Sequence, residues 1–347
     1  MSKPTTIKSR ASGRATLAAV AQLAGVASMT ASRAINQPEL VSPLLRAKVA
    51  QAVADLGYVP NRAARALASA KSNTIVVLVP SLSNAVFTSV LDGIQSVVDA
   101  SNYQLLMGNT RYSDAEEEKL LGIYLQSNPD GILLAGLSHS PRVEQMLAHA
   151  RVPVVSMMDF DRDQAQQGSA ALSVGFSQLE AAYTMTRYLL DKGHTKIGFV
   201  GAQLDERTLR RAEGYRRAMH EAKAFDPRLE ILVAEPSSIA LGAELLGRML
   251  ARVPDCEAIF CTNDNLAHGA IYQCQRRGIA VPEQLAICGF NDLPASAWMK
   301  PSVTTVSTPL YRIGFEAASM LLATIRGEQP PITQVDLGFM LMARESA

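Results

Sequence analysis

The chain has 347 residues, of which 48% are hydrophobic and 19% are charged, and its formal net charge is +1. This composition supplies enough apolar material for two or three folded domains and excludes a globally disordered protein. No apolar run approaches the roughly 18 residues of a membrane-spanning helix, and no apolar stretch of a secretory signal follows the basic N-terminus. We therefore expect a cytoplasmic protein that makes no contact with a membrane.

The charge is unevenly distributed along the chain. Residues 1–73 contain ten Lys or Arg residues and two acidic ones, so this segment carries a net charge of +8 and the remainder −7. Such a basic segment indicates a polyanionic partner, although a solvated basic tail would give the same balance. The first 14 residues are basic and are expected to be disordered.

The next stretch has the apolar spacing of three short helices. The first runs from Leu17 to Ala24, and the second covers about Ser28 to Asn36. In the third, Ser42 is the expected N-cap, Pro43 the first helical residue and Gly57 the terminator. Its buried stripe is predicted to consist of Leu45, Val49, Val53 and Leu56.

Two helices joined by a glycine turn, with a basic second helix, are typical of a helix-turn-helix unit that enters the major groove of DNA. Within SMTASRAIN, Arg33 suits a bidentate contact to guanine, and Met29 suits a thymine methyl group. Thr30 and Ser32 are placed to donate to phosphate oxygens, which position a protein without reading sequence. A small helical bundle with a surface arginine would show the same pattern, so DNA binding stays open at this point.

From residue 74 onward, short apolar runs alternate with amphipathic segments of helix length, which predicts parallel sheets covered by helices on both faces. The predicted strands are 75–79, 104–107, 131–135, 154–158, 197–200, 230–233, 258–261, 285–289 and 304–306. Examples of the helices are 86–100, 115–126, 178–192, 208–222, 241–251, 266–277 and 312–326. About 270 residues are large for one core and favour two lobes.

Polar residues follow several predicted strands, at the edge where parallel sheets bind ligands. They include Asp159, Asn263, Asp264, Asn291 and Asp292. Arg207, Arg210 and Arg211 follow strand 197–200, and paired arginines are suited to a carboxylate or a phosphate. Because Asn and Asp suit hydroxyl groups, the composition favours a polyhydroxy acid as ligand.

These polar residues also have structural interpretations. Each could cap a helix, Asp264 in particular, and the charged residues of 205–210 could pair with one another. Arg111 and Tyr112 follow another strand but are expected on the surface.

The cysteines and histidines show no pattern of catalysis or metal binding. Cys256, Cys261, Cys274 and Cys288 include no CxxC pair and have no histidine at metal-ligand spacing, so they are interpreted as buried hydrophobic residues. The chain contains no G-x-S-x-G sequence, phosphate-binding loop or metal triad. We expect no cofactor, no metal and no enzymatic activity.

The N-terminal segment closely resembles the DNA-binding head of the lactose-repressor family. VAQLAGVASMTASRAIN and VSPLLRAKVAQAVADLGYVPNRAARALA contain A-x-x-A-G-V, T-x-S-R, R-x-K-V and L-G-Y-x-P-N in the order and spacing of that family. The resemblance implies that a hinge helix forms on the operator and that each subunit inserts Leu67 into the minor groove. The DNA-binding residues expected from pattern and resemblance are Ser28, Met29, Thr30, Ser32, Arg33, Asn36, Asn61, Ala64 and Leu67.

One departure concerns the cap of the second helix. Family members usually have Ser or Thr where Ala27 stands, so this helix lacks its usual cap unless Ser28 replaces it.

The resemblance continues through the rest of the chain and implies the two-lobed fold of a periplasmic binding protein. GAQLDERTLRRAEGY, FCTNDNLAHGA and LAICGFND are similar to the gluconate-operon repressors of the family. The implied effector is gluconate, 2-ketogluconate or 6-phosphogluconate. The implied effector-binding residues are Val86, Phe87, Asp159, Phe176, Arg211, Asn263 and Asn291, and the charge argument adds Arg207.

The expected fold is a small all-α helix-turn-helix head plus an α/β two-lobed, periplasmic-binding-protein-like body with parallel sheets. The expected boundaries are 1–60 for the head, 61–73 for the hinge and 74–347 for the body, with lobe 1 at about 74–174 and 307–337 and lobe 2 at about 175–306. The resemblance implies a homodimer, with its body contact near 86–101, on double-stranded operator DNA. No leucine heptad follows the last strand, so no tetramer is expected.

The expected function is transcriptional repression of sugar-acid catabolism, relieved when the effector favours a state that cannot hold the operator. The alternative is a regulator that answers to a different sugar, to a co-repressor or to a phosphocarrier protein. A periplasmic sugar-binding protein would share the body, but the basic N-terminal segment and the missing signal argue against it.

Overall fold

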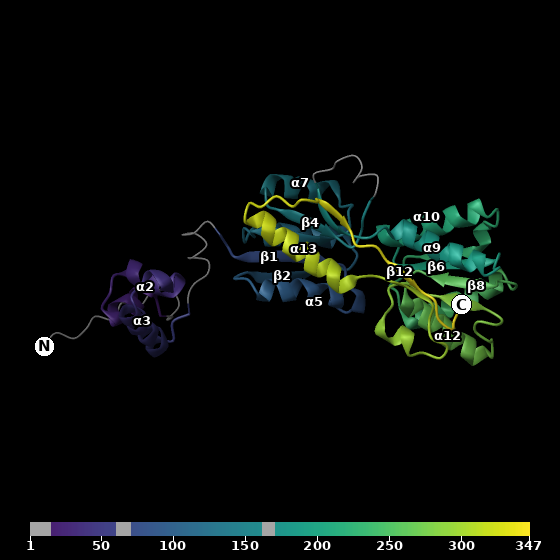
Figure 1. Ribbon diagram of the computed structural model, residues 1–347, viewed down its shortest axis with the longest axis horizontal. Coiled ribbons are helices and arrows are strands. Elements are labelled where there is room, and N and C mark those ends of the chain that lie inside the picture. Colours follow the sequence, from purple (N-terminus) through teal and green to yellow (C-terminus); the bar gives the residue numbers. More distant parts are fainter. Residues whose placement is uncertain (1–14, 60–70, 162–170) are drawn as a thin grey trace. The chain divides into compact units, whose positions relative to one another are not determined.

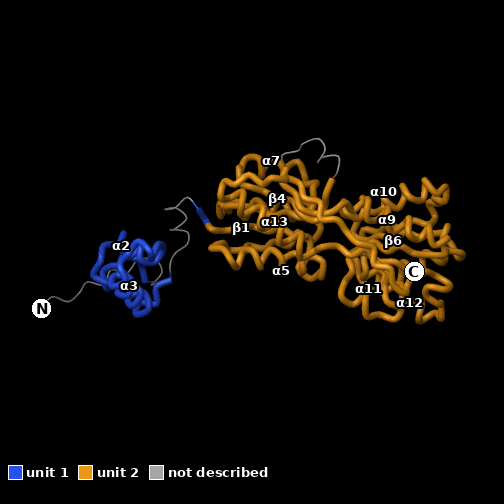
Figure 2. Tube along the Cα trace, in the orientation of Figure 1, with its two compact units in different colours: residues 1–72 blue, residues 73–347 orange. Residues whose placement is uncertain are grey.

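The computed structural model describes residues 15–59, 71–161 and 171–347. The chain forms two compact units, residues 1–72 and residues 73–347 (Figure 2). We call the first the N-terminal unit and the second the body.

The N-terminal unit consists of α1 (Leu17–Ala24), α2 (Ser28–Asn36), the 3-10 turn η1 (Pro38–Leu40) and α3 (Pro43–Leu56). Thr16 begins α1, because its side chain accepts a hydrogen bond from the Ala19 amide at 3.2 Å. Glycines in left-handed conformation end α1 and α3. The core of this unit consists of Val20, Ala21, Ala31, Ala34, Val41, Val49 and Ala52.

Three details of the predicted caps and buried stripe differ. Leu56 is 37% exposed, and Ala52 is buried in its place. No side chain caps α2, so Ser28 does not replace the missing family residue at Ala27. Ser42 occupies the N-cap position of α3 as predicted, but its side chain makes no capping hydrogen bond.

The first lobe of the body contains a six-stranded parallel sheet with the order β11-β5-β4-β3-β1-β2 (Figure 1). Its core faces alternate along β1, so that Ile75 and Val77 pack with α5 and α13 while Val76 and Leu78 pack with α6 and α7. Burial on both faces explains the continuous apolar run TIVVLV. The elements are β1 (Thr74–Val79), α5 (Ala85–Asp99), β2 (Gln104–Asn109), α6 (Asp114–Leu125), β3 (Gly131–Ala135), α7 (Pro141–Ala150), β4 (Val154–Met157), β5 (Leu172–Gly175), α13 (Leu310–Ile325) and β11 (Gln334–Asp336).

The second lobe contains a four-stranded parallel sheet with the order β7-β6-β8-β9. Phe199 faces α9 and α10, and its neighbour Val200 faces α11 and α12. The elements are α9 (Gln178–Asp191), β6 (Ile197–Ala202), α10 (Glu206–Glu221), η2 (Pro227–Leu229), β7 (Glu230–Val233), α11 (Ile239–Arg252), β8 (Ala258–Cys261), α12 (Asp264–Arg277), β9 (Ala286–Cys288) and η3 (Pro294–Ala297).

The chain passes between the lobes at several points. β5 leads into α9 of the second lobe, and β10 (Thr305–Ser307) leads back to α13 of the first. After β11 the chain returns, and β12 (Met340–Met342) pairs antiparallel with β10. Figure 1 shows this C-terminal stretch in yellow, running along both lobes. The first lobe is therefore completed only by residues that follow the second.

The predicted class of fold is confirmed, and the strand runs read from the sequence are present with small shifts at their ends. β5, β11 and β12 are absent from those runs. LSVG of β5 has only two strongly apolar residues and is stabilised by pairing between β4 and β11. Within the described ranges, no helix is long and apolar enough to cross a membrane. The same ranges contain no group of three His, Cys, Asp or Glu side chains placed as metal ligands.

Candidate DNA-binding helix and effector site

Helix α2 separates its core-facing residues from the residues expected to contact DNA. Ala31 and Ala34 are buried, whereas Ser28, Met29 and Arg33 are exposed. Met29 is 67% exposed, so its side chain is available for contact with a partner. This arrangement is the one that a groove-reading helix requires.

The remaining predicted DNA contacts lie at the margin of this face or beyond the described residues. Thr30, Ser32 and Asn36 are half-buried. The Asn36 amide donates to the Ser32 carbonyl oxygen at 3.0 Å and therefore lies along the helix. The predicted hinge contacts Asn61, Ala64 and Leu67 fall outside the described residues.

In the body, the predicted effector residues lie where the two lobes meet. The ring of Phe176, which follows β5, stacks on that of Phe290, which follows β9, with centroids 6.2 Å apart. The Arg207 guanidinium of α10 lies 5.2 Å from the centroid of the Phe87 ring of α5. Seven of the eight residues are between 0% and 8% exposed, namely Val86, Phe87, Asp159, Phe176, Arg207, Arg211 and Asn291. The contacts of Phe87 with Arg207 and of Phe176 with Phe290 therefore join the two lobes.

Arg211 is the central charged group of this site. Its Nε donates to Gln178 Oε1 at 2.8 Å, its Nη1 donates to the Thr262 carbonyl oxygen at 2.6 Å, and its guanidinium stacks 3.9 Å from the Phe290 centroid. It forms no ion pair within 4.0 Å with a described carboxylate, although Asp205 and Asp159 are close enough to influence it. Burial lowers the Arg211 pKa to about 10, so the group remains a cation at neutral pH.

The other two arginines already have carboxylate partners. Arg207 Nε donates to Asp205 Oδ2 at 3.1 Å. Arg210 Nη2 contacts Glu206 at 2.9 Å, and its Nη1 contacts Asp161 at 3.1 Å. The structural interpretation of residues 205–210, pairing among their own members, therefore holds for these two arginines, and Arg211 lies outside that set.

Asp159 and Thr262 offer polar atoms to the same region. Asp159 is 1% exposed, and its Oδ1 accepts from the Phe160 amide at 2.9 Å. Its Oδ2 has no hydrogen-bond partner among the described residues and lies 3.5 Å from Arg210 Nε. Burial raises the Asp159 pKa to about 6, against the opposing charge of Arg210. Thr262 Oγ1 is also buried without a partner in the described chain.

Asn263 and Asp264, at the start of α12, both have structural roles, and the interpretation of Asp264 as the helix cap is wrong. Asn263, not Asp264, caps α12, because its Oδ1 accepts from the Leu266 amide at 3.2 Å and from the Ser237 hydroxyl at 2.9 Å. Asp264 is fully buried and binds the segments that follow β9 and form β10.

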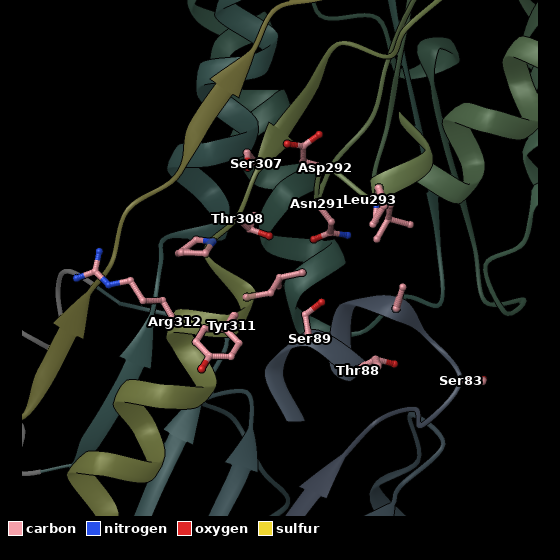
Figure 3. Close-up of a pocket in the computed structure, with 14 residues that line it drawn as sticks. Ser83, Thr88, Ser89, Asn291, Asp292, Leu293, Ser307, Thr308, Tyr311 and Arg312 are labelled. Atoms are coloured by element: carbon pink, nitrogen blue, oxygen red, sulfur yellow. The ribbon is translucent and has the colours of Figure 1, made fainter. Parts of the chain in front are cut away.

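Asn291 lines a pocket of about 630 Å³ between the start of α5, residues 291–294 and residues 307–312. Figure 3 shows its amide, the Thr308 hydroxyl and the Ser89 hydroxyl directed into the same space. Thr308 Oγ1 is buried without a partner in the described chain. The φ angles of Asn291 and Asp292 are 101° and 54°, left-handed conformations that neighbouring contacts must hold and that often mark functional sites.

A second pocket, of about 710 Å³, is lined by Arg207 and by the loops after β2, β3 and β6. Tyr112 lines this pocket and packs edge-on against Phe87 with centroids 6.4 Å apart, so the expected surface position of Tyr112 is wrong. Arg111 is exposed as expected. Sequence reasoning also missed Gln178, which orients Arg211. The signal for Tyr112 was its position after a strand of the same sheet, whereas nothing local distinguished Gln178.

Comparison with known proteins agrees with both parts of the structure. Residues 16–61 match the family model of the lacI-family bacterial regulatory proteins, and residues 186–347 match a periplasmic binding protein-like domain. The HTH-type transcriptional regulator GntR of Pseudomonas aeruginosa is 46% identical over 97% of both chains.

Two solved structures extend this likeness. The transcription regulator GntR from Chromobacterium violaceum is 50% identical, with a TM-score of 0.75 over 79% of this chain and 98% of that one. A LacI-family regulator from Silicibacter pomeroyi is 32% identical, with a TM-score of 0.87 over 96% of this chain and 99% of that one.

An exposed recognition helix joined to a two-lobed body with a buried polar site defines a helix-turn-helix transcriptional regulator. The chain belongs to the lacI family of bacterial regulatory proteins, as its motifs predicted.

Proposed function

We propose that this protein represses genes of sugar-acid catabolism, binds operator DNA as a homodimer and is released by a sugar acid such as gluconate. The observation that carries the choice of effector is Arg211, a buried cation without a carboxylate partner in the described body. A buried charge is costly unless it is paired, and the carboxylate of a ligand would supply the missing partner.

The surrounding polar atoms favour a hydroxylated chain on that carboxylate. Asp159 Oδ2 and Thr262 Oγ1 are buried and lack hydrogen-bond partners in the described chain. Leaving such atoms unsatisfied costs about 1–3 kcal/mol each, and ligand hydroxyl groups can satisfy both. Gluconate and 2-ketogluconate carry one carboxylate and several hydroxyls, and 6-phosphogluconate adds a phosphate.

The position of the site between the lobes explains how the effector would act. A ligand that prefers one angle between the lobes shifts the population toward that angle, in proportion to its difference in affinity for the two states. The proposed result is a body that no longer supports two DNA-bound recognition helices.

The effector is tested by calorimetry and thermal unfolding with gluconate, 2-ketogluconate, 6-phosphogluconate, a neutral pentose and a purine. In Arg211→Met we expect gluconate affinity to fall by about 10- to 100-fold, the value of a charged hydrogen bond. The melting temperature without ligand should fall, because the buried Gln178 Oε1 and Thr262 carbonyl oxygen lose their donor. Arg216→Met on the same helix, where Arg216 pairs with Glu230 away from the site, is the matched control.

The outcomes separate the alternatives. Binding only of the pentose or purine would keep the regulator and reject the sugar acid. No response to any small molecule would favour a phosphocarrier protein as the signal.

DNA binding is tested by selecting duplexes from a random pool and measuring their affinity with and without gluconate. Arg33→Ala should relax preference at one base pair of each half-site by about 1–3 kcal/mol. Lys48→Ala removes one positive charge, as Arg33→Ala does, from an exposed position on α3. It should lower the affinity for all duplexes by the same factor. A base preference that survives Arg33→Ala would reject Arg33 as a base reader, and tighter binding with gluconate would reverse the sign of the proposed response.

A further inference from the structure

Asp264 is buried in the second lobe without a basic partner among the described residues, which is unusual for a carboxylate. It is 0% exposed, and only uncharged groups donate to it. Its Oδ2 accepts from the Leu293 amide at 2.6 Å and from the Ser296 hydroxyl at 2.9 Å, and its Oδ1 accepts from the Thr305 hydroxyl at 2.7 Å. Three hydrogen bonds compensate a charge that burial alone would make costly.

The groups that donate to Asp264 come from two segments, one at the pocket and one at the connection between the lobes. Leu293 and Ser296 belong to the turn that follows Asn291, the residue that faces the 630 Å³ pocket. Thr305 belongs to β10, whose chain continues through residues 307–309 into α13 of the first lobe. One carboxylate therefore joins the loop at the pocket to the connection between the lobes.

Further contacts fit this loop closely around the carboxylate. A Cβ atom on Gly289 would lie 2.1 Å from Asp264 Oδ1, so only glycine leaves room for the carboxylate at the end of β9. The Asp264 amide donates to the Phe290 carbonyl oxygen at 3.0 Å, and the Asn291 amide donates to the Val306 carbonyl oxygen at 2.8 Å. The left-handed backbone of Asn291 is thus held from both sides.

His268 completes the arrangement one turn further along α12. It is 4% exposed, and its Nε2 lies 2.9 Å from Ser296 Oγ. Because the single Ser296 hydroxyl proton is donated to Asp264, His268 must donate from Nε2, and the chain of bonds runs His268 to Ser296 to Asp264. The Ser296 hydroxyl thereby accepts from His268 and donates to Asp264, which makes the group a structural connection.

We propose that Asp264 is a positioning residue that couples the pocket lined by Asn291 to the connection between the lobes through its bond to Thr305. The inference rests on the proposed effector response. Occupation of the pocket displaces or fixes the loop at Asn291. Asp264 moves with this loop because it is hydrogen-bonded to Leu293 and Ser296. Its bond to Thr305 then displaces β10 and, through it, α13. Thr305 does not itself line the pocket and is the point at which this path can be cut, and its Oγ1 also accepts from the amide of the pocket residue Asp292 at 3.4 Å.

The test uses the full-length protein, gluconate and the duplex selected with the wild-type protein. Thr305→Val keeps the shape of the side chain and removes the bond to Asp264. We expect gluconate affinity within threefold of wild type, whereas the factor by which gluconate changes duplex affinity should fall at least fivefold. Thr305→Ser retains the hydroxyl and should restore that factor.

A matched control separates coupling from loss of stability. Thr186 is a fully buried threonine of the same lobe, and its hydroxyl donates to the Ala182 carbonyl oxygen at 2.9 Å. Thr186→Val should lower the melting temperature by an amount similar to that of Thr305→Val. It should leave unchanged the factor by which gluconate changes duplex affinity. An unchanged factor in Thr305→Val, or an equal loss in Thr186→Val, would overturn the proposal.

A measurement without ligand decides the inference even where the effector assignment fails. In hydrogen exchange of the free protein, the Leu293 and Asn291 amides should exchange at least fivefold faster in Thr305→Val, and at the wild-type rate in Thr186→Val. Unchanged exchange at both amides would reject the connection. A wild-type protein that does not respond to gluconate would reject the proposed effector instead.

Discussion

At the scale of single residues, burial moves the pKa of two carboxyl groups of the body above its ordinary range. Burial raises the pKa of both Asp159 and Asp264 to about 6. Their native pKa values exceed the value of 3.8 that applies when the chain is unfolded. The native state therefore binds protons more tightly, and its free energy of unfolding falls as the pH rises through 6.

This shift predicts an unusual pH dependence of stability. Between pH 7.5 and pH 5, the free energy of unfolding should gain about 1 kcal/mol from each of the two carboxyl groups. Asp159→Asn removes one titration, and denaturation at both pH values should show the gain reduced by about that amount. An identical gain in wild type and variant would mean that Asp159 is not perturbed in the native state.

The uncapped recognition helix is the second feature at this scale. No side chain accepts a hydrogen bond from the first turn of α2 at Ala27. Ala27→Ser should supply that acceptor and stabilise α2 by roughly 1 kcal/mol. We expect the amides of α2 to exchange about fivefold more slowly in the full-length protein. Leu40→Ser, an exposed change outside the cap, should leave them unchanged.

At the scale of elements, α5 and α13 pack so closely that glycines define their crossing. A Cβ atom on Gly314 would lie 1.9 Å from the Val90 carbonyl oxygen, and one on Gly93 would lie 2.1 Å from that of Tyr311. Backbone atoms cannot move aside as a flexible side chain can. The helix pair therefore has one stable register, next to the pocket that Asn291 lines.

Gly314→Ala should separate the two helices and cost about 1–3 kcal/mol of stability or more. Gly122→Ala on α6 is the matched control, because its Cβ would meet no atom within 4 Å. The control should gain roughly 0.5–1 kcal/mol from helix propensity. Urea unfolding of both variants checks the prediction, and equal stability of the two would contradict the close approach.

At the scale of the whole molecule, the body is completed by its last residues. Ser346 is fully buried, its hydroxyl donates to the Ile287 carbonyl oxygen at 2.5 Å, and it accepts from the Thr304 amide at 2.8 Å. These bonds attach the C-terminal segment to β9 and to the segment before β10. The second lobe therefore depends on residues far from it in sequence.

Ser346→Ala should lower the free energy of unfolding by about 1–3 kcal/mol, because a buried amide and a buried carbonyl lose their partner. Ser302→Ala, which removes a half-buried hydroxyl bonded to the exposed Glu345, should cost less than about 0.5 kcal/mol. Chemical denaturation of the two variants distinguishes them, and similar losses would show that the Ser346 contacts are not specific.

The sequence by itself determined the local structure and the family. Helices α1 and α2 and the strands β3, β7 and β8 have the bounds that their apolar spacing predicted, because periodicity, caps and turns act over a few residues. The fixed spacing of motifs such as L-G-Y-x-P-N identified the family for the same reason. The outward position of Met29 and Arg33 also followed from helical spacing alone.

Tertiary structure decided which polar residues act together, because hydrogen bonding and burial join segments that are distant in sequence. The sequence does not distinguish Arg207 from Arg211, which lies four positions further along. In the structure Arg207 pairs with Asp205, whereas Arg211 donates to Gln178 and Thr262. A helix cap was one of two interpretations of Asp264 from the sequence, and its connection to Leu293 and Thr305 arises only when β8, β9 and β10 lie side by side. Local patterns specify which groups are available, and the fold determines which of them lose water and must find a partner.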